Sequence, residues 1–254
     1  MSFGYDYSCT TLSQEGRIYQ LEYAEKAVET SSSVMGVSCK DGIILASEKI
    51  RNYKTIVRGS NSTIYSITPN IGVAICGHLP DGRNIVARAK QESKSYFQNF
   101  GLEISGKILA ERIALYVQSH TLYWSMRPFG SVAMISSFDP NGNHLYMIEG
   151  NGNCFEYYNC AQGKGRQFIK AEVERDIYNF RNRTCNDAIA DVMKILVKSY
   201  EGEKETEYDL SVISFETNGK HKIFDYQKID EMVRKIKNVG NAENDDNKKM
   251  QIDL

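Results

Sequence analysis

The order of strand-like and helix-like segments constrains the fold of this 254-residue chain most strongly. Alternating or apolar runs bounded by turn residues predict strands, and apolar residues at three- and four-residue steps predict helices. After a first helix, the predicted elements come in blocks: strands, two helices, strands, two helices, a hairpin and a last helix. This is not the regular alternation of a parallel doubly wound sheet. We therefore expect an α+β fold in which antiparallel sheets pack face to face with helix layers outside.

The boundaries of the elements follow from turn and capping residues. Strands are predicted over residues 33–40, 43–46, 62–67, 71–76, 131–138, 145–149, 154–160, 208–215 and 221–224, and helices over about 17–30, 81–100, 105–124, 167–179, 186–200 and 227–239. Asp41-Gly42 is a strong hairpin signal. Asp81 is the expected N-cap of its helix, and either Thr184 or Asn186 caps the helix from 186.

Composition places the chain among ordinary globular proteins. It is 41% hydrophobic and 25% charged, and with no Pro/Gly/Ser-rich linker we expect one domain over residues 1–239. Residues 240–254 have too little apolar content to pack, so a mobile polar tail is expected there. The net charge of -1 argues against a nucleic-acid binder, and no apolar run is long enough for a membrane span.

Cysteine and histidine patterns predict no metal site. The six cysteines form no C-x-x-C pair, and the four histidines show no ligand spacing. Free thiols in a reducing cytoplasm or nucleus are the expectation, and no cofactor is predicted.

The stretch from Thr10 to Thr30 predicts a turn followed by an amphipathic helix. The turn is Ser13-Gln14-Glu15-Gly16, and Glu22 and Lys26 are spaced for an i,i+4 ion pair. The apolar face carries Ile18, Leu21, Ala24 and Val28. Such a helix needs a surface to pack on, and the pattern leaves open whether its own domain or a neighbouring chain supplies that surface.

The same stretch resembles the N-terminal signature of proteasome alpha subunits. The matching residues are Tyr5-Asp6, Gly16-Arg17, Gln20-Leu21-Glu22-Tyr23-Ala24 and Ala27-Val28, and Arg127-Pro128-Phe129-Gly130 and Gly163-Lys164 extend the likeness along the chain. The resemblance implies a four-layer αββα sandwich of the N-terminal nucleophile hydrolase type. Residues 2–6, 116–117, 121–123 and 145–148 resemble one alpha subtype in particular.

The resemblance also implies that the chain is not an enzyme. Catalytic relatives expose an N-terminal threonine whose free amine serves as base, with a nearby lysine that lowers its pKa. Here Ser32 falls at the nucleophile position with 31 residues before it, Glu48 matches the acidic partner, and Thr63 replaces the lysine. We expect no catalytic residues. An active amidohydrolase of the same fold, favoured by Glu48, and a globular protein outside any assembly are the alternatives.

As an alpha subunit, the chain is expected to work in an assembly in the cytoplasm and nucleus. The implied partners are other alpha subunits in a heptameric ring, beta subunits, and regulatory particles that dock on the ring. Residues 1–16 form the implied gate segment and residues 17–30 the helix that packs on ring neighbours. The gate cluster is Tyr5, Asp6, Gln14 and Tyr23, and the ring-packing residues are Arg17, Gln20, Glu22 and Tyr23.

Three positions depart from the family pattern. Tyr7 replaces an arginine, and Gln14 replaces the turn proline and leaves that turn with a freer φ. Thr63 occupies the position of the lysine that binds the C-terminal carboxylates of activators, so this pocket is expected to bind such tails weakly.

Overall fold

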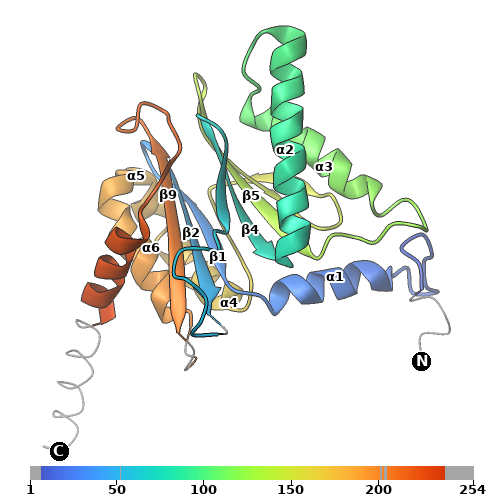
Figure 1. The fold of residues 1–254 in the computed structure, drawn as a ribbon, viewed down its shortest axis with the longest axis horizontal. Helices are drawn as coiled ribbons and strands as arrows, with labels where there is room; N and C mark the ends of the chain where they lie inside the picture. The colour runs from blue at the N-terminus through green and yellow to red at the C-terminus, as the bar shows by residue number, and fades with distance from the viewer. Residues whose placement is uncertain (1–6, 52, 201, 203–204, 238–254) are drawn as a thin grey trace, which may run out of the picture.

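The computed structural model describes residues 7–51, 53–200, 202 and 205–237. Two five-stranded sheets, each antiparallel throughout, form the centre of the molecule (Figure 1). The strand orders are β10-β9-β2-β1-β8 in the first sheet and β3-β4-β5-β6-β7 in the second. The predicted α+β class with antiparallel sheets is therefore confirmed.

The elements have the following bounds. The first sheet contains β1 (Val34–Ser38), β2 (Gly42–Ile50), β8 (Asn159–Gln162), β9 (Thr206–Ser214) and β10 (Lys222–Ile223). The second contains β3 (Ile64–Thr68), β4 (Ile71–Gly77), β5 (Ser131–Asp139), β6 (Gly142–Ile148) and β7 (Cys154–Tyr157). The helices are α1 (Tyr19–Glu29), α2 (Leu79–Phe100), α3 (Gly106–Ser119), α4 (Arg166–Arg175), α5 (Ile177–Asn182) and α6 (Cys185–Lys198), and residues 226–237 are helical as well.

Three hydrophobic clusters join four layers. One cluster lies between α2, α3 and the second sheet, and another lies between α4, α5, α6, residues 226–237 and the first sheet. The third fills the space between the two sheets. Strand β2 shows why this works, because Ile43 and Leu45 enter the middle cluster while Ile44 and Ala46 enter the outer one. A strand that is apolar on both faces can only be buried between two layers, which is the αββα arrangement.

The segment 154–160, predicted as one strand, is two strands in different sheets. Strand β7 pairs with β6 in the second sheet, and β8 pairs with β1 in the first. Tyr158 is the single residue between them, and its carbonyl accepts a hydrogen bond from the Ser38 N–H at 2.8 Å. The sequence around it is strand-forming throughout and contains no glycine or proline, so nothing local marks the crossing.

Two predicted helix ends were wrong because tertiary contacts set them. Helix α2 begins at Leu79 after His78, and Asp81, the expected N-cap, instead accepts hydrogen bonds from Arg127 and from the Gly130 N–H. Helix α3 ends at Ser119, five residues before the expected Trp124, which is 82% exposed.

The caps of two other helices agree with the residue chemistry. The Ser105 hydroxyl accepts from the Ile108 N–H at α3, and the Thr184 hydroxyl accepts from the Asp187 N–H at α6. Asn186, the alternative cap, lies inside α6. The predicted helix 167–179 breaks at Asp176 into α4 and α5, and the break allows Phe180 to enter the core of the first sheet.

The structure also bears on the expectations about cysteines, membrane spans and the C-terminal tail. All six cysteines are free thiols. In the part of the chain that the structure describes, no helix is long and apolar enough to cross a membrane. The tail at 240–254 lies outside the described residues.

His221 ties the two sheets together at the edge formed by β3 and β10. Its backbone N–H donates to the Pro69 carbonyl at 2.6 Å, and its Nδ1 is 2.7 Å from the Ser66 hydroxyl. Its ring lies against Gly72, where a Cβ would come within 2.2 Å of the imidazole. Burial lowers the pKa of His221 to about 4.

The pKa of His221 predicts a loss of stability in mild acid. Because the folded pKa lies below the unfolded value of about 6.5, the unfolded chain takes up the proton more readily as pH falls. The stabilisation is complete above about pH 6.5 and decreases towards about pH 4. We expect the free energy of unfolding to fall by roughly 2 kcal/mol between about pH 7 and about pH 5 through this group.

Urea unfolding of the full chain across this range measures the effect. His221→Gln is expected to flatten the pH dependence, whereas Lys220→Gln, the exposed neighbour, leaves it in place. An unchanged slope in His221→Gln would contradict the assignment.

Candidate functional site

Helix α1 extends away from the sandwich beneath α2 and α3, with only its C-terminal end against the sheets (Figure 1). Val28 is its only buried residue, and Ile18, Leu21 and Ala24 are half-buried. A cavity of about 140 Å³ lies beside Val28, between α1 and Phe129. One buried valine contributes roughly 1.5–3 kcal/mol, whereas fixing the backbone of a single residue costs roughly 1–2 kcal/mol. The chain's own core therefore supplies only part of the surface that the apolar face of α1 needs.

Val28 packs on a surface formed by the backbone around Gly77 and Gly130, which we call its seat. A Cβ on Gly77, which has φ +108°, would meet the Gly130 carbonyl oxygen at 2.4 Å and Val28 at 3.1 Å. The His78 N–H donates to the Gly130 carbonyl at 2.7 Å. Gly77, where a side chain would strike the Gly130 carbonyl, thus allows β4, the segment before β5 and α1 to meet at one point.

An ion pair holds this seat together. Asp81 accepts two hydrogen bonds from Arg127, at 2.7 and 2.8 Å, and a third from the Gly130 N–H at 2.9 Å. Partial burial alone would raise the pKa of Asp81, but these three donors outweigh it and lower the pKa. The Arg-Pro-Phe-Gly segment that carried the resemblance is therefore the clamp under α1.

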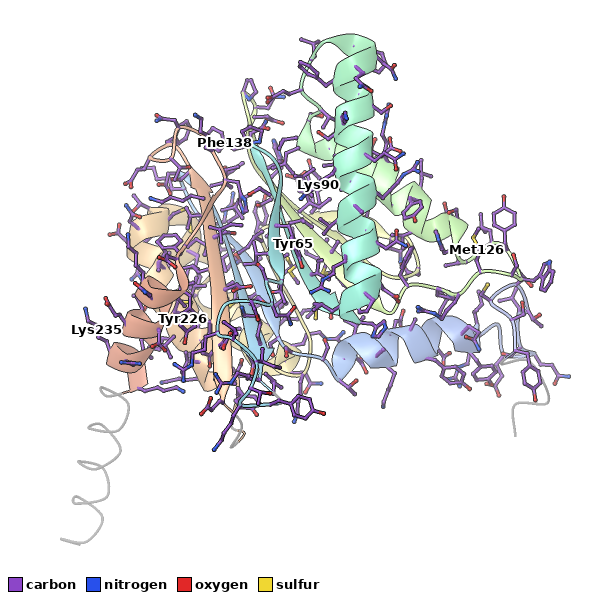
Figure 2. All side chains as sticks on the ribbon, in the orientation of Figure 1. Tyr65, Lys90, Met126, Phe138, Tyr226 and Lys235 are labelled. Carbon is purple, nitrogen blue, oxygen red and sulfur yellow. The ribbon has the colours of Figure 1, made fainter. Side chains whose placement is uncertain are left out.

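The segment before α1 is fixed by Cys9. Its buried Sγ lies 3.4 Å from the Tyr123 carbonyl oxygen, 3.6 Å from that of Met126 and 3.8 Å from that of His120. Met126 marks this loop beside the start of α1 in Figure 2. These carbonyls converge because α3 ends early, so the same turn that shortens α3 binds the N-terminal segment. Cysteine is among the residue types most often buried, which is the one sequence signal for this contact.

The predicted ring-packing residues lie at the start of α1, and two of them bind each other. Arg17 donates to Glu22 through Nε at 2.7 Å and through Nη2 at 2.5 Å, and Arg17 lowers the pKa of Glu22. The expected Glu22–Lys26 pair is wrong, because Arg17 takes the carboxylate. Tyr23 is 50% exposed and stacks on Tyr19 with centroids 6.4 Å apart.

The predicted gate cluster is only partly described. Gln14 is exposed in the turn before α1, which closes through a hydrogen bond from the Gly16 N–H to the Ser13 carbonyl. Gln20, one of the predicted ring-packing residues, is half-buried on α1. Tyr5 and Asp6 lie outside the described residues, so their contacts with Gln14 and Tyr23 remain a prediction.

Ser32, at the position of the missing nucleophile, is bonded into a continuous backbone. It follows α1 through Thr30 and Ser31, and its carbonyl oxygen lies 3.4 Å from the Cys76 Sγ. Glu48 Oε2 accepts from the Ser33 N–H at 3.3 Å, and Ser33 Oγ accepts from the Gly165 N–H at 2.9 Å. The acidic group thus holds the Ser33 backbone amide, and the Ser33 hydroxyl is a second hydrogen-bond partner that lowers its pKa.

The carboxyl of Glu48 is strongly buried. Burial raises its pKa, while hydrogen bonds from Ser33 and the ammonium of Lys164 act in the opposite direction. Its Oε1 has no hydrogen-bond partner among the described residues. This geometry positions the backbone at the start of β1 through the amide and the hydroxyl of Ser33.

Thr63 lies inside the molecule, in a network that joins the two sheets. Its N–H and hydroxyl donate to Asp209 Oδ2, at 2.8 and 3.1 Å, and its Oγ1 lies 2.7 Å from the Ser47 hydroxyl. Asp209 Oδ1 accepts from the Lys49 ammonium at 2.7 Å. Thr63 is 6% exposed and Lys49 7%. No local pattern indicates that Asp209 and Lys49 meet here, because they come from strands far apart along the chain.

Metal binding finds no support in the described residues. Among them, no group of three or more His, Cys, Asp or Glu side chains is arranged to hold an ion. Position 63 itself contributes no cation, and the nearest ammonium, that of Lys49, is already paired with Asp209.

Comparison with known families gives one consistent result. The family model described as "Proteasome subunit" matches residues 28–213, and the model for the N-terminal signature of A-type proteasome subunits matches residues 5–27. The resemblance drawn from the sequence is confirmed.

Relatives at substantial identity carry the alpha type-3 or alpha type-7 name. The alpha type-3 proteasome subunit of Oryza sativa is 44% identical over 220 residues, 86% of this chain and 88% of the relative. The Arabidopsis thaliana protein of the same name is 43% identical, over 82% of this chain and 83% of the relative. The probable alpha type-7 proteasome subunit of Schizosaccharomyces pombe is 41% identical, over 86% of each. Alpha type-3 is also the subtype indicated by residues 2–6, 116–117, 121–123 and 145–148.

The clamp under α1 predicts a measurable loss of stability in Asp81→Asn. The substitution removes the charge that Arg127 and Gly130 bind, and we expect the free energy of unfolding to fall by about 1–3 kcal/mol. Asp191→Asn is the matched control, because Asp191 bonds Arg183 at 2.7 Å on the exposed surface and should cost less than about 1 kcal/mol.

The urea concentration at the midpoint of unfolding measures the stability of both variants. Limited proteolysis between residues 17 and 31 is expected to quicken in Asp81→Asn only. Equal behaviour of the two variants would show that the clamp does not hold α1.

Proposed function

The chain belongs to the proteasome subunit family, and we propose that it acts as a non-catalytic alpha subunit of the 20S core particle, of the alpha type-3 kind. In this role it is one member of the outer heptameric ring, contributes to the gate through which substrates enter, and offers a docking surface to regulatory particles. The observation that carries the proposal is a retained N-terminal segment, matched by the alpha signature over residues 5–27, that runs through α1 into the first strand.

The absence of peptidase chemistry is supported by the start of β1. A threonine-type nucleophile needs a free α-amine beside it, and Ser32 has an amide bond to Ser31 instead. Glu48 binds the Ser33 backbone, and position 63 carries no ammonium. An active amidohydrolase of the same fold, the competing function, would need Glu48 to face a nucleophile.

Ring packing is supported by the uncovered part of α1. The half-buried Ile18, Leu21 and Ala24 and the exposed Tyr23 present an apolar and aromatic surface that this chain covers only in part. A neighbouring alpha subunit is the partner we assign to it. The Arg17–Glu22 pair then orders the start of the helix, and Tyr19 and Tyr23 supply contact area.

The gate role falls on residues 1–16, the segment before α1, together with Tyr23 of α1. With Cys9 held by the loop after α3, we expect the residues before it to project towards the axial pore, and Tyr5, Asp6, Gln14 and Tyr23 are the proposed gate cluster. Beta subunits and regulatory particles are the further partners, in ubiquitin-dependent and ubiquitin-independent degradation. The proposed location is the cytoplasm and nucleus.

Native mass spectrometry of the complex purified through this chain tests the function. We expect the chain in a particle with other alpha and beta subunits, still carrying the residues before Ser32. Ser32→Ala should leave peptide hydrolysis by the particle unchanged, because Ser32 has no free amine. A chain that is monomeric and hydrolyses peptides in a Ser32-dependent way would overturn the proposal.

The absence of a cation at Thr63 predicts weak binding of activator tails at this pocket. In a cryo-EM map of the particle with an activator, tail density beside this subunit should be the weakest among the alpha pockets, because a C-terminal carboxylate lacks a charged partner. Thr63→Lys should strengthen that density, and Ser60→Lys, at an exposed position, should not. Firm density in the unmodified pocket would contradict the prediction. If Thr63→Lys fails to fold, the comparison among the unmodified pockets still decides.

A further inference from the structure

A cavity of about 560 Å³ opens where the chain crosses from the second sheet to the first. Its walls come from the end of β1, the start of β6, the end of β7 and α5. Its lining includes Ser38, Lys40, Glu156, Tyr158 and Arg181. None of them belongs to the gate segment, the start of β1 or the Thr63 network, so the cavity is separate from the sites described above.

Two cations at this cavity are left unpaired. The Arg181 guanidinium lies over the Tyr158 ring, with its Cζ 4.0 Å from the ring centroid, and neither Arg181 nor Lys40 has an ion-pair partner in the described part of the chain. Nearby arginines are different, since Arg183 pairs with Asp191 and Arg175 with Glu172. A guanidinium stacked on a ring keeps the N–H groups along its edge free to donate, in a geometry that fits two oxygens of one anion.

With the other polar groups of its lining counted, the cavity keeps a net positive charge. Glu156 is the acidic residue of the lining, and it already accepts at 2.7 Å from the His144 ring. The Ser38 oxygen accepts from the Asn143 amide at 3.1 Å, which leaves the Ser38 hydroxyl hydrogen available. The cavity therefore offers two free positive charges and a hydroxyl donor, and its one carboxylate is occupied.

We propose that this cavity binds the phosphoryl group of a phosphate monoester. Arg181 donates to two phosphoryl oxygens, Lys40 supplies the second charge, and Tyr158 keeps the guanidinium in place. A phosphate monoester carries close to two negative charges near neutral pH, which matches the two cations better than a single carboxylate does. The volume exceeds that of inorganic phosphate and lies in the usual range for small-ligand sites, so the site has room for the group that carries the phosphate. No bond is made or broken.

Isothermal titration calorimetry of the purified full chain with three probes tests this proposal. Glycerol phosphate represents a free small ligand, a capped phosphoserine peptide represents a modified side chain, and the unphosphorylated peptide is the negative probe. We expect saturable binding of at least one phosphorylated probe, weakened by added salt, and none of the negative probe. The phosphorylated probe that binds more tightly identifies the source of the ligand.

Charge-removing variants assign the binding to this cavity. Arg181→Gln and Lys40→Gln should each weaken binding by about 5- to 10-fold through loss of a charge-assisted hydrogen bond. The controls are Arg175→Gln, on α4, and Lys90→Gln, labelled on α2 in Figure 2, neither of which lines the cavity. Circular dichroism and the urea midpoint verify that each variant is folded. If no phosphorylated probe binds saturably, or if both cavity variants bind like the controls, the proposal is overturned. Neither result bears on ring membership, which rests on other residues.

Discussion

Two sheets packed face to face are the constraint on which the rest of this structure depends. Each sheet has a second apolar face, so helices must cover both outer surfaces, and strand β2 is buried on both faces, with an apolar run from Ile43 to Ala46. Buried polar side chains are costly unless they are hydrogen-bonded. The Lys49–Asp209–Thr63 network is bonded in this way, whereas His221 Nε2 and Glu48 Oε1 have no partner among the described residues. The network and the other contacts of His221 both hold β3 of the second sheet to the first.

Helix α1 is joined to this sandwich at its C-terminal end. It reaches the sheets only through Val28, on a seat made by Gly77 and Gly130 and clamped by Asp81 and Arg127. The same segment fills the place where a catalytic relative would expose a nucleophile. The stretch that leads into β1 therefore joins Ser32 to α1 and presents a helix that its own domain covers only in part.

What the sequence could predict was set by local physics. Turns, Ser and Thr caps and two-sided apolar strands depend on neighbouring residues. The hairpin predicted at Asp41-Gly42 forms, although its turn lies at Lys40-Asp41 and Gly42 begins β2, and Thr184 caps α6 as its chemistry predicts. The errors involve partners that the local pattern does not indicate. Asp81 looked like a cap and binds Arg127, and Glu22 was expected to bind Lys26 and binds Arg17.

The candidate site residues show the same difference between what local sequence predicts and what depends on distant partners. Resemblance placed Ser32, Glu48 and Thr63, but their contacts with Ser33 and Asp209 required the folded chain. The Cys9 anchor was also hidden, since carbonyls from three separate residues create it.

The crossing at Tyr158 gives the sandwich two unequal sides. Along one side, β7 and β8 are joined through a single residue, so the sheets cannot separate there without breaking strand pairing. Along the opposite side, β3 and β10 belong to different sheets and are held together by hydrogen bonds of His221. The backbone at Tyr158 therefore joins the two sheets covalently at one edge. At the opposite edge the sheets are held by the contacts of His221 and Asp209, so partial separation of the sheets starts there.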